Sequence, residues 1–204
     1  MKKIIFLFLA ILIISSCNKK EESISSLPQS PTFTSESFPL KIGNWWKYQV
    51  INSSTGFIDT MLITIIDSNE IKNYSLLKVH WINYKFNDTS NYRFNKSAFW
   101  FDISDYNYLF HIYLHFPFTL NSTWLDSLRP IIRTPYIVND YIENFEILGN
   151  NYNVFKIEMN YIIPNEKMNL TFYLAAGIGI VQEDILGDEP YPNRIIKLIE
   201  YHLE

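Results

Sequence analysis

The sequence predicts an all-β protein built on a single curved antiparallel sheet, a meander that forms a half-barrel or a roll. Apolar residues alternate with more polar neighbours along many segments, as Trp46, Tyr48 and Val50 do near the start of the domain, and this is the period of a half-buried strand. No window of twelve or more residues carries the 3.6-residue apolar stripe of a helix. Short loops between the segments favour antiparallel neighbours.

The expected strands are rich in Ile, Val, Tyr, Phe and Thr, the residues that favour β structure. In chain order they are 45–50, 59–67, 76–86, 91–95, 98–103, 108–115, 141–148, 155–161, 169–175, 179–186 and 194–203. Turn-forming clusters separate them, for example 52–56 and 149–151. If the domain has a helix, we expect it around 120–128. A sheet of this length must curl or close to cover its apolar face.

The N-terminus is typical of a secretory signal peptide over residues 1–16. Lys2 and Lys3 precede the apolar run 4–14, which is too short for a comfortable membrane span and ends in small residues. The segment 14–17, Ile-Ser-Ser-Cys, resembles the bacterial lipobox. The resemblance implies that Cys17, the only cysteine, becomes the acylated first residue of a lipoprotein anchored in a membrane. A lone cysteine also rules out an internal disulfide.

Residues 17–37 are expected to form the lipidated Cys17 and a flexible tether, because this stretch holds few large apolar groups. The run 18–22, Asn-Lys-Lys-Glu-Glu, resembles the signal that sends lipoproteins of the phylum Bacteroidota to the surface of the outer membrane. We therefore expect a cell-envelope, outer-membrane lipoprotein that is displayed on the surface. The remainder, 38–204, has the length of a single domain.

The charge of the chain argues against nucleic acid as a partner. Its formal net charge is −4, and cleavage of the signal peptide would remove Lys2 and Lys3, which makes the mature chain more negative. A nucleic-acid-binding domain usually carries a basic patch that neutralises phosphates. The expected partners are the membrane, through the anchor, and an unidentified hydrophobic ligand, glycan or envelope protein.

Two phrases resemble an uncharacterised family of Bacteroidota lipoproteins. The first, F-P-L-x-x-G-N-x-W-x-Y, is matched by 38–48, Phe-Pro-Leu-Lys-Ile-Gly-Asn-Trp-Trp-Lys-Tyr. The second, an aromatic residue followed within a few positions by G-(V/I)-G-(L/I)-V, is matched within 173–183. Ala176 and Gln182 stand where that family usually has proline and lysine. A hairpin at 144–161, with Gly149 at its turn, also fits its arrangement.

This resemblance implies a curved antiparallel domain, distantly similar to the half-barrels of periplasmic lipoprotein carriers, and it brings no catalytic residues. The motif residues have structural interpretations. Gly43 permits an unusual backbone angle before a strand, and Trp46 and Tyr48 supply large inward faces. Gly177 and Gly179 allow a bulge or a close backbone approach. They lack the third glycine and the helix of a nucleotide-binding loop.

The spacing of the candidate metal-binding residues does not match a known metal-binding motif. His111 and His115 lie four residues apart but lack the glutamate of a zincin and an evident third ligand. An acidic group around Gly187 lacks the spacing of a calcium loop, so a solvated hairpin end is the preferred interpretation; its members are Glu183, Asp184, Asp188 and Glu189. We expect neither a metal nor a cofactor.

Catalysis has no signature either. Acid pairs such as Asp102 with Asp105 or Glu143 with Glu146 would need to flank one bond to cleave a glycoside, and the sequence does not place them across a cleft. The motif G-x-S-x-G, which marks a serine nucleophile on a sharp turn, is absent. We therefore expect a protein that is not an enzyme.

Aromatic residues make up 17% of the chain and gather between residues 99 and 118. Packed inside a curved sheet they are a core, and exposed on its concave face they bind acyl chains or sugars. Trp100, Tyr108 and Phe110 are the candidates to face a ligand. The leading hypothesis is a non-catalytic binding or scaffolding domain on a membrane anchor. The alternatives are a carrier or chaperone for hydrophobic ligands and a surface protein that binds or processes glycans.

Overall fold

A computed structural model describes residues 30–71, 74–82, 87–103, 110–125, 134–163, 166–187 and 193–204. Nearly all of them belong to one compact unit, Pro31–Glu204. The predicted signal peptide, Cys17 and most of the predicted tether lie outside the described residues.

Twelve strands form one sheet in which all neighbouring strands are antiparallel. They run in the order β7-β6-β5-β4-β3-β2-β14-β13-β12-β11-β10-β9. Strands adjacent in this sheet follow one another along the chain, except that β14 pairs with β2. The predicted all-β meander is therefore confirmed. The strands are β2 Trp45–Asn52, β3 Ile58–Ile71, β4 Tyr74–Ile82, β5 Asn87–Asn95, β6 Ala98–Ile103, β7 Phe110–His115, β9 Thr123–Leu125, β10 Pro135–Ile147, β11 Asn150–Ile163, β12 Glu166–Ala175, β13 Gly179–Gly187 and β14 Arg194–His202.

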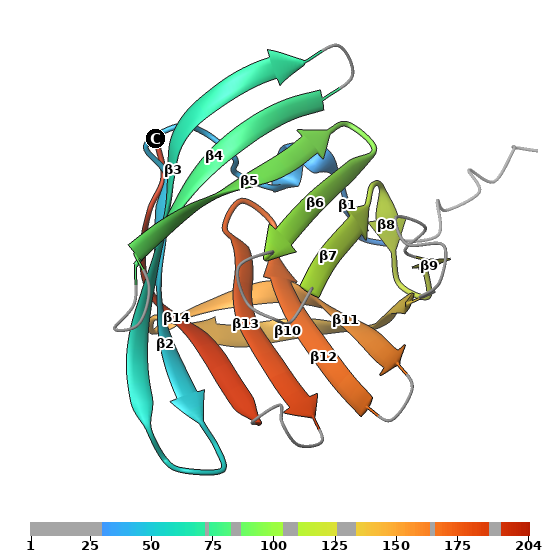
Figure 1. Ribbon diagram of the computed structural model, residues 1–204. Helices are drawn as coiled ribbons and strands as arrows, with labels where there is room; N and C mark the ends of the chain where they lie inside the picture. The colour runs from blue at the N-terminus through green and yellow to red at the C-terminus, as the bar shows by residue number, and fades with distance from the viewer. Residues whose placement is uncertain are drawn as a thin grey trace, which may run out of the picture. The chain divides into compact units, whose positions relative to one another are not determined.

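The sheet curls strongly, as Figure 1 shows. Sheets of more than about ten strands rarely stay flat and open, because the twist accumulates from strand to strand. Register shifts add local bends, for example between Ile65 and Asp67 on β3 and between Leu198 and Glu200 on β14. The concave face formed in this way carries the buried apolar set, including Phe172 and Leu174 on β12, both 0% exposed.

Side chains bridge the two edges of the sheet. The backbone N–H of Tyr113 on β7 donates to the hydroxyl of Tyr136 on β10 at 3.0 Å. The indole N–H of Trp124 on β9 donates to the carbonyl of Tyr113 at 2.7 Å. The rings of Trp124 and Tyr136 stack with centroids 5.4 Å apart. The backbone N–H and carbonyl of Tyr113, on the edge strand β7, are thus hydrogen-bonded by side chains and not by a further strand.

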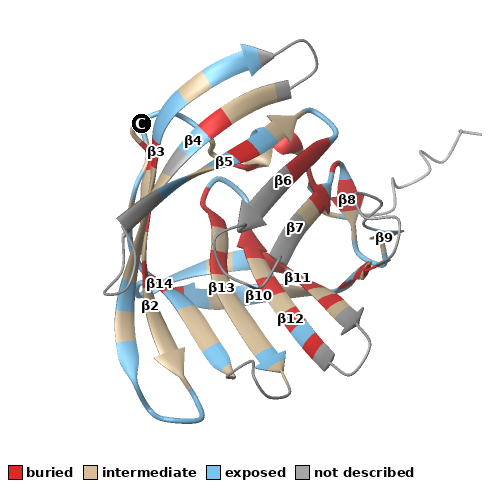
Figure 2. Ribbon diagram, viewed as in Figure 1, coloured by how far each residue is buried: buried red, intermediate tan, exposed pale blue. Residues whose placement is uncertain are grey.

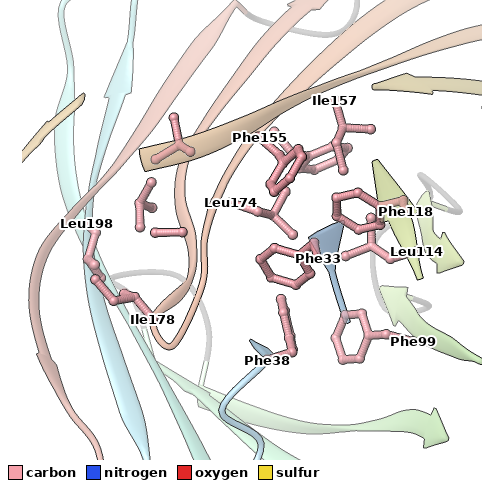
Figure 3. Packing of buried hydrophobic residues seen from close by; sticks show 14 of the residues in the cluster. Phe33, Phe38, Phe99, Leu114, Phe118, Phe155, Ile157, Leu174, Ile178 and Leu198 are labelled. Carbon is pink, nitrogen blue, oxygen red and sulfur yellow. The ribbon is translucent and has the colours of Figure 1, made fainter. Parts of the chain in front are cut away.

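The segment before the first long strand packs into the concave side of the sheet. The short strand β1 (Thr32–Phe33) pairs with β8 (Phe118–Thr119), and a 3₁₀ turn, η1, follows at Ser35–Ser37. Phe33 is 0% exposed, and its ring stacks on Phe118 with centroids 5.0 Å apart. Figure 3 shows it among rings contributed by distant parts of the chain.

This packing corrects the predicted boundary between tether and domain. We expected the tether to run to residue 37 and the fold to begin at 38, whereas the folded unit begins at Pro31. The backbone N–H of Gly177 donates to the carbonyl of Ser37 at 2.8 Å, so the segment is also hydrogen-bonded to the β12–β13 turn. The fully enclosed ring of Phe33, the pairing with β8 and this hydrogen bond together hold the segment in the fold.

The expected helix at 120–128 is also wrong in its described part. Residues 120 and 121 form a turn and β9 covers Thr123–Leu125. The structure adds β1, β8 and β9, which are two or three residues long, too short to show alternation. It also extends the strand expected at 141 back to Pro135.

Candidate functional site

The two sequence phrases meet in space. The indole N–H of Trp46 on β2 donates to the carbonyl of Ile178 at 2.7 Å, and the hydroxyl of Tyr48 donates to the carbonyl of Ile180 at 2.9 Å. Both aromatic side chains are buried. They cross the intervening β14 on the concave side and attach the first phrase to the β12–β13 turn.

The glycines of the phrases lie at positions that restrict the side chain. Gly43 has φ +94°, and a Cβ there would lie 2.8 Å from the carboxylate of Glu204. Gly179 has φ +99°, and a Cβ there would lie 3.7 Å from the ring of Phe38, while Gly177 has φ +77°. Positive φ disfavours any residue with a Cβ. These positions therefore shape the turns around the phrases.

One part of the concave face stays open. Met61 and Ile63 on β3, Ile185 on β13 and Ile196 on β14 share the inward register of buried neighbours but are only half-buried. Figure 2 shows this intermediate class along β2, β13 and β14, in contrast to the buried positions of β12. We call these four residues the open apolar face.

Glu183 lies beside the open apolar face. On β13 it pairs with Phe172 of β12 on one side and Ile196 of β14 on the other, so its side chain shares their inward face. Burial raises the pKa of its carboxyl to about 7, the charge of Asp184 acts in the same direction, and Arg194 opposes it. A carboxyl that titrates near neutrality inside a β domain is a candidate functional group.

Two phenols accompany Glu183. Burial is the main cause that raises the pKa of Tyr48 and of Tyr92 on β5, and the charge of Glu183 raises both further. The hydroxyl of Tyr48 also reaches β13, the strand that carries Glu183, where it donates to the carbonyl of Ile180. Because the phenols remain neutral at physiological pH, the group presents oxygen atoms of low charge around one carboxyl that can ionise.

This arrangement corrects the interpretation of the acidic group around Gly187 as a solvated hairpin end. Successive residues of a strand point to opposite faces, so Glu183 points inward and Asp184 outward. Asp184 accepts a hydrogen bond from the side-chain amide of Gln182 at 2.8 Å. Asp188 and Glu189 lie outside the described residues. No group of three His, Cys, Asp or Glu side chains suited to a metal occurs among the residues that the structure describes.

The aromatic candidates for ligand contact are not resolved by the structure. Trp100 lies on β6 and Phe110 on β7, but their side chains are outside the described part, and Tyr108 is outside it altogether. Other members of the aromatic run belong to the core: Phe99, Phe116 and Phe118 are at most 3% exposed.

The remaining chemical candidates gain no support as sites. His115 is exposed at the end of β7, and the side chain of His111 is not described. Glu143 and Glu146 are both exposed on β10. The side chain of Asp102 and all of Asp105 lie outside the described residues, so the pair Asp102 and Asp105 stays a hypothesis from the sequence.

A separate hollow of about 420 Å³ lies near the start of the folded unit. Its walls include Tyr141 on β10, Tyr152 on β11, and the side chains of Asn151, Asn153 and Thr32. The lining combines aromatic rings with amide groups.

Comparison with known proteins identifies the N-terminus. A profile of the prokaryotic membrane lipoprotein lipid attachment site matches residues 1–18, which include Cys17. The chain is therefore a membrane-anchored lipoprotein of the cell envelope. Among the described residues, no helix is long and apolar enough to cross a membrane. Comparison with curated proteins gives no match.

Two crystal structures are similar to the domain. One is of a protein from Bacteroides fragilis, assigned as exported and having a YmcC-like fold; it is 12% identical, covers 81% of this chain and 98% of that one, and has a TM-score of 0.51. The other, assigned as a lipoprotein of Parabacteroides distasonis, is 12% identical, covers 81% of this chain and 97% of that one, and has a TM-score of 0.49. At this identity the first likeness shows a shared fold and no more.

Sequence reasoning missed Glu183 as an inward-facing group. Its neighbours Gln182, Asp184 and Asp188 make the segment look like a solvated acidic turn. The available signal was the alternation itself, since Val181, Glu183 and Ile185 occupy every second position. The alternation does not predict the bulge between Tyr173 and Leu174, which lies opposite Val181.

Proposed function

We propose that this lipoprotein is a non-catalytic binding protein whose domain holds a small apolar ligand on the open apolar face. The observation that supports the proposal is the half-burial of Met61, Ile63, Ile185 and Ile196 in an inward register. Apolar surface left accessible beside a packed core is stabilised when a ligand covers it. No described constellation supplies a nucleophile with its base.

A carrier with an empty half-barrel fits less well. Phe33, Phe38 and Phe118 fill the concave side near β1 and β8, and the two edges are bridged through Tyr113. A long acyl chain would have to displace this packing. The open apolar face suits a ligand that covers a few side chains.

The test uses the chain from Asn18 to Glu204, which contains the whole folded unit, and the neutral dye Nile red. Ile196→Trp places a bulky ring on the open apolar face, and Ile195→Trp places the same ring on the outer face of the same strand. Dye fluorescence should increase on addition of the parent chain or of Ile195→Trp, and the increase should be smaller with Ile196→Trp. Equal binding by both variants, or no binding by the parent, would reject the proposal.

We also propose that the anchor lies in the outer membrane with the domain on the cell surface. The lysine-then-glutamate order of 19–22 after Cys17 supports this placement. Replacing Glu21 and Glu22 with alanine should reduce labelling of the protein on intact cells by a membrane-impermeant biotin reagent. Unchanged labelling, measured against total protein after lysis, would show that residues 19–22 do not direct the protein to the cell surface.

The hollow beside β10 and β11 favours glycan binding as a second candidate function. Aromatic rings and amides are groups that contact sugars well, and Tyr141, Asn151 and Tyr152 combine them. Asn151→Ala should weaken binding to any oligosaccharide found on a glycan array, whereas Asn150→Ala, an exposed neighbour outside the hollow, should not. Silence of the parent chain on the array would count against this function.

A further inference from the structure

Glu183 is a carboxylate without a donor. No hydrogen bond or ion pair to its side chain occurs among the residues that the structure describes. The adjacent carboxylate, Asp184, accepts a hydrogen bond from the side-chain amide of Gln182. Glu183 is half-buried on the concave face, so its carboxylate is partly withdrawn from water and still reachable from the concave side. Glu183 is therefore suited to a donor that comes from outside the chain.

The nearest phenol for which a hydrogen bond is described, that of Tyr48, offers Glu183 no proton. The proton of the Tyr48 hydroxyl is already given to the carbonyl of Ile180, so the Tyr48 oxygen can only accept on its remaining side. The walls next to it are the apolar side chains of Ile185 and Ile196. A ligand that fits must bring several N–H donors on an apolar body.

Building on the proposed function, we propose that the open apolar face selects amphipathic primary amines, whose ammonium group is held by the carboxylate of Glu183 and the hydroxyl oxygen of Tyr48. The alkyl body then covers Met61, Ile185 and Ile196. An ammonium carries three donors and a positive charge, which matches a carboxylate and a neutral oxygen acceptor. An alcohol of the same length lacks the charge, and a fatty acid carries the wrong one.

Other charged or titratable groups near this position set its dependence on pH. Arg194 on β14 is the nearby cation that favours the ionised carboxylate, and Asp184 opposes ionisation. Tyr48 and Tyr92 stay neutral, and the register also places Asp59 on the inward face of β3. Glu183 ionises as the pH rises through about 7, while an alkyl amine stays protonated up to about pH 10. Selectivity for the amine should therefore appear across neutral pH.

The experiment titrates the chain from Asn18 to Glu204 with n-hexylamine, 1-hexanol and hexanoate by isothermal calorimetry. At about pH 8.5 hexylamine should bind about ten- to a hundredfold more tightly than hexanol, the range of a charge-assisted hydrogen bond. The preference should shrink at about pH 5.5, where Glu183 is protonated. Glu183→Gln should bring the two affinities within about twofold, whereas Glu200→Gln, an exposed carboxylate on the outer side of β14, should leave the preference intact.

The outcomes separate this inference from the proposed function. Nile red binding that Ile196→Trp blocks, together with no preference for hexylamine, overturns the inference and leaves the proposed function standing. A preference that persists in Glu183→Gln assigns the ammonium to another group and also overturns it. Absence of binding by all three probes overturns the inference, and the dye then decides the proposed function on its own.

Discussion

Replacing Phe33 with alanine tests whether the segment before the first long strand belongs to the fold. The ring is 0% exposed and contacts four others, stacking on Phe118 at 5.0 Å and meeting Phe155 edge-on at 6.0 Å. Truncating a fully buried phenylalanine costs about 3–5 kcal/mol, from lost burial and the cavity left behind. For a domain of this size each kcal/mol lowers Tm by about 2–4 °C. We therefore expect a loss of about 6–20 °C.

The assay is urea denaturation and scanning calorimetry of the chain from Asn18 to Glu204. Phe57→Ala is the matched control, because Phe57 is 49% exposed in the β2–β3 turn, and its loss should cost less than about 1 kcal/mol. If both variants unfold at the same temperature, the segment at 31–37 is a loosely held tether and the reasoning is refuted.

Three other changes probe the site, the sheet edges and the anchor. Glu183→Gln should stabilise the domain at about pH 8 but hardly at pH 4.5. The pKa of Glu183 in the folded domain is raised to about 7, so the folded state is favoured by the protonated carboxyl below the ordinary pKa of a glutamate and loses that advantage as the pH rises through 7. The gain in stability at pH 8 is at most about 3 kcal/mol, and an equal effect at both pH values in urea titrations would contradict the prediction. Tyr136→Phe should cost about 1–3 kcal/mol and speed amide exchange of Tyr113, whereas Tyr141→Phe on the same strand should do neither. Cys17→Ser should release the protein from the membrane fraction, and continued sedimentation with membranes would argue against acylation.

The meander was predictable because alternation and turn residues recur through the chain. The predicted hairpin with Gly149 at its turn is present as β10 and β11, and the predicted strand at 98–103 matches β6. Turns of this kind depend on local residues, such as a glycine at φ +76°. Most neighbouring strands could therefore be predicted from the alternation and the turn residues between them.

Contacts between distant parts of the chain could not be predicted. The pairing of β14 with β2 joins the last long strand to the first, and no local signal specifies such a partner. Phe33 looked like part of a tether because its neighbours are polar, and only its enclosure by Phe118 and Phe155 places it in the core. Trp124 and Tyr136 likewise gain their role at the sheet edge from a strand that is distant in sequence.

The site was hardest to predict because it depends on which face a residue occupies. The aromatic run drew attention to Trp100, Tyr108 and Phe110, yet the group on which the proposed site depends is Glu183, an inward-facing carboxylate without a donor among the described residues. Its sequence neighbours suggested a solvated turn, whereas the register with Phe172 directs it inward. A single bulge in β13 or β12 is enough to exchange the two faces.

The most direct measurement of the central claim is a methyl NMR titration of the chain from Asn18 to Glu204 with n-hexylamine. The isoleucine methyl groups of Ile185 and Ile196, on the open apolar face, should shift progressively and saturate. Those of Ile195 and Ile58, which lie on the outer face, should stay in place. Shifts confined to the outer face, or no shifts at all, would contradict the claim that this concave surface receives a ligand.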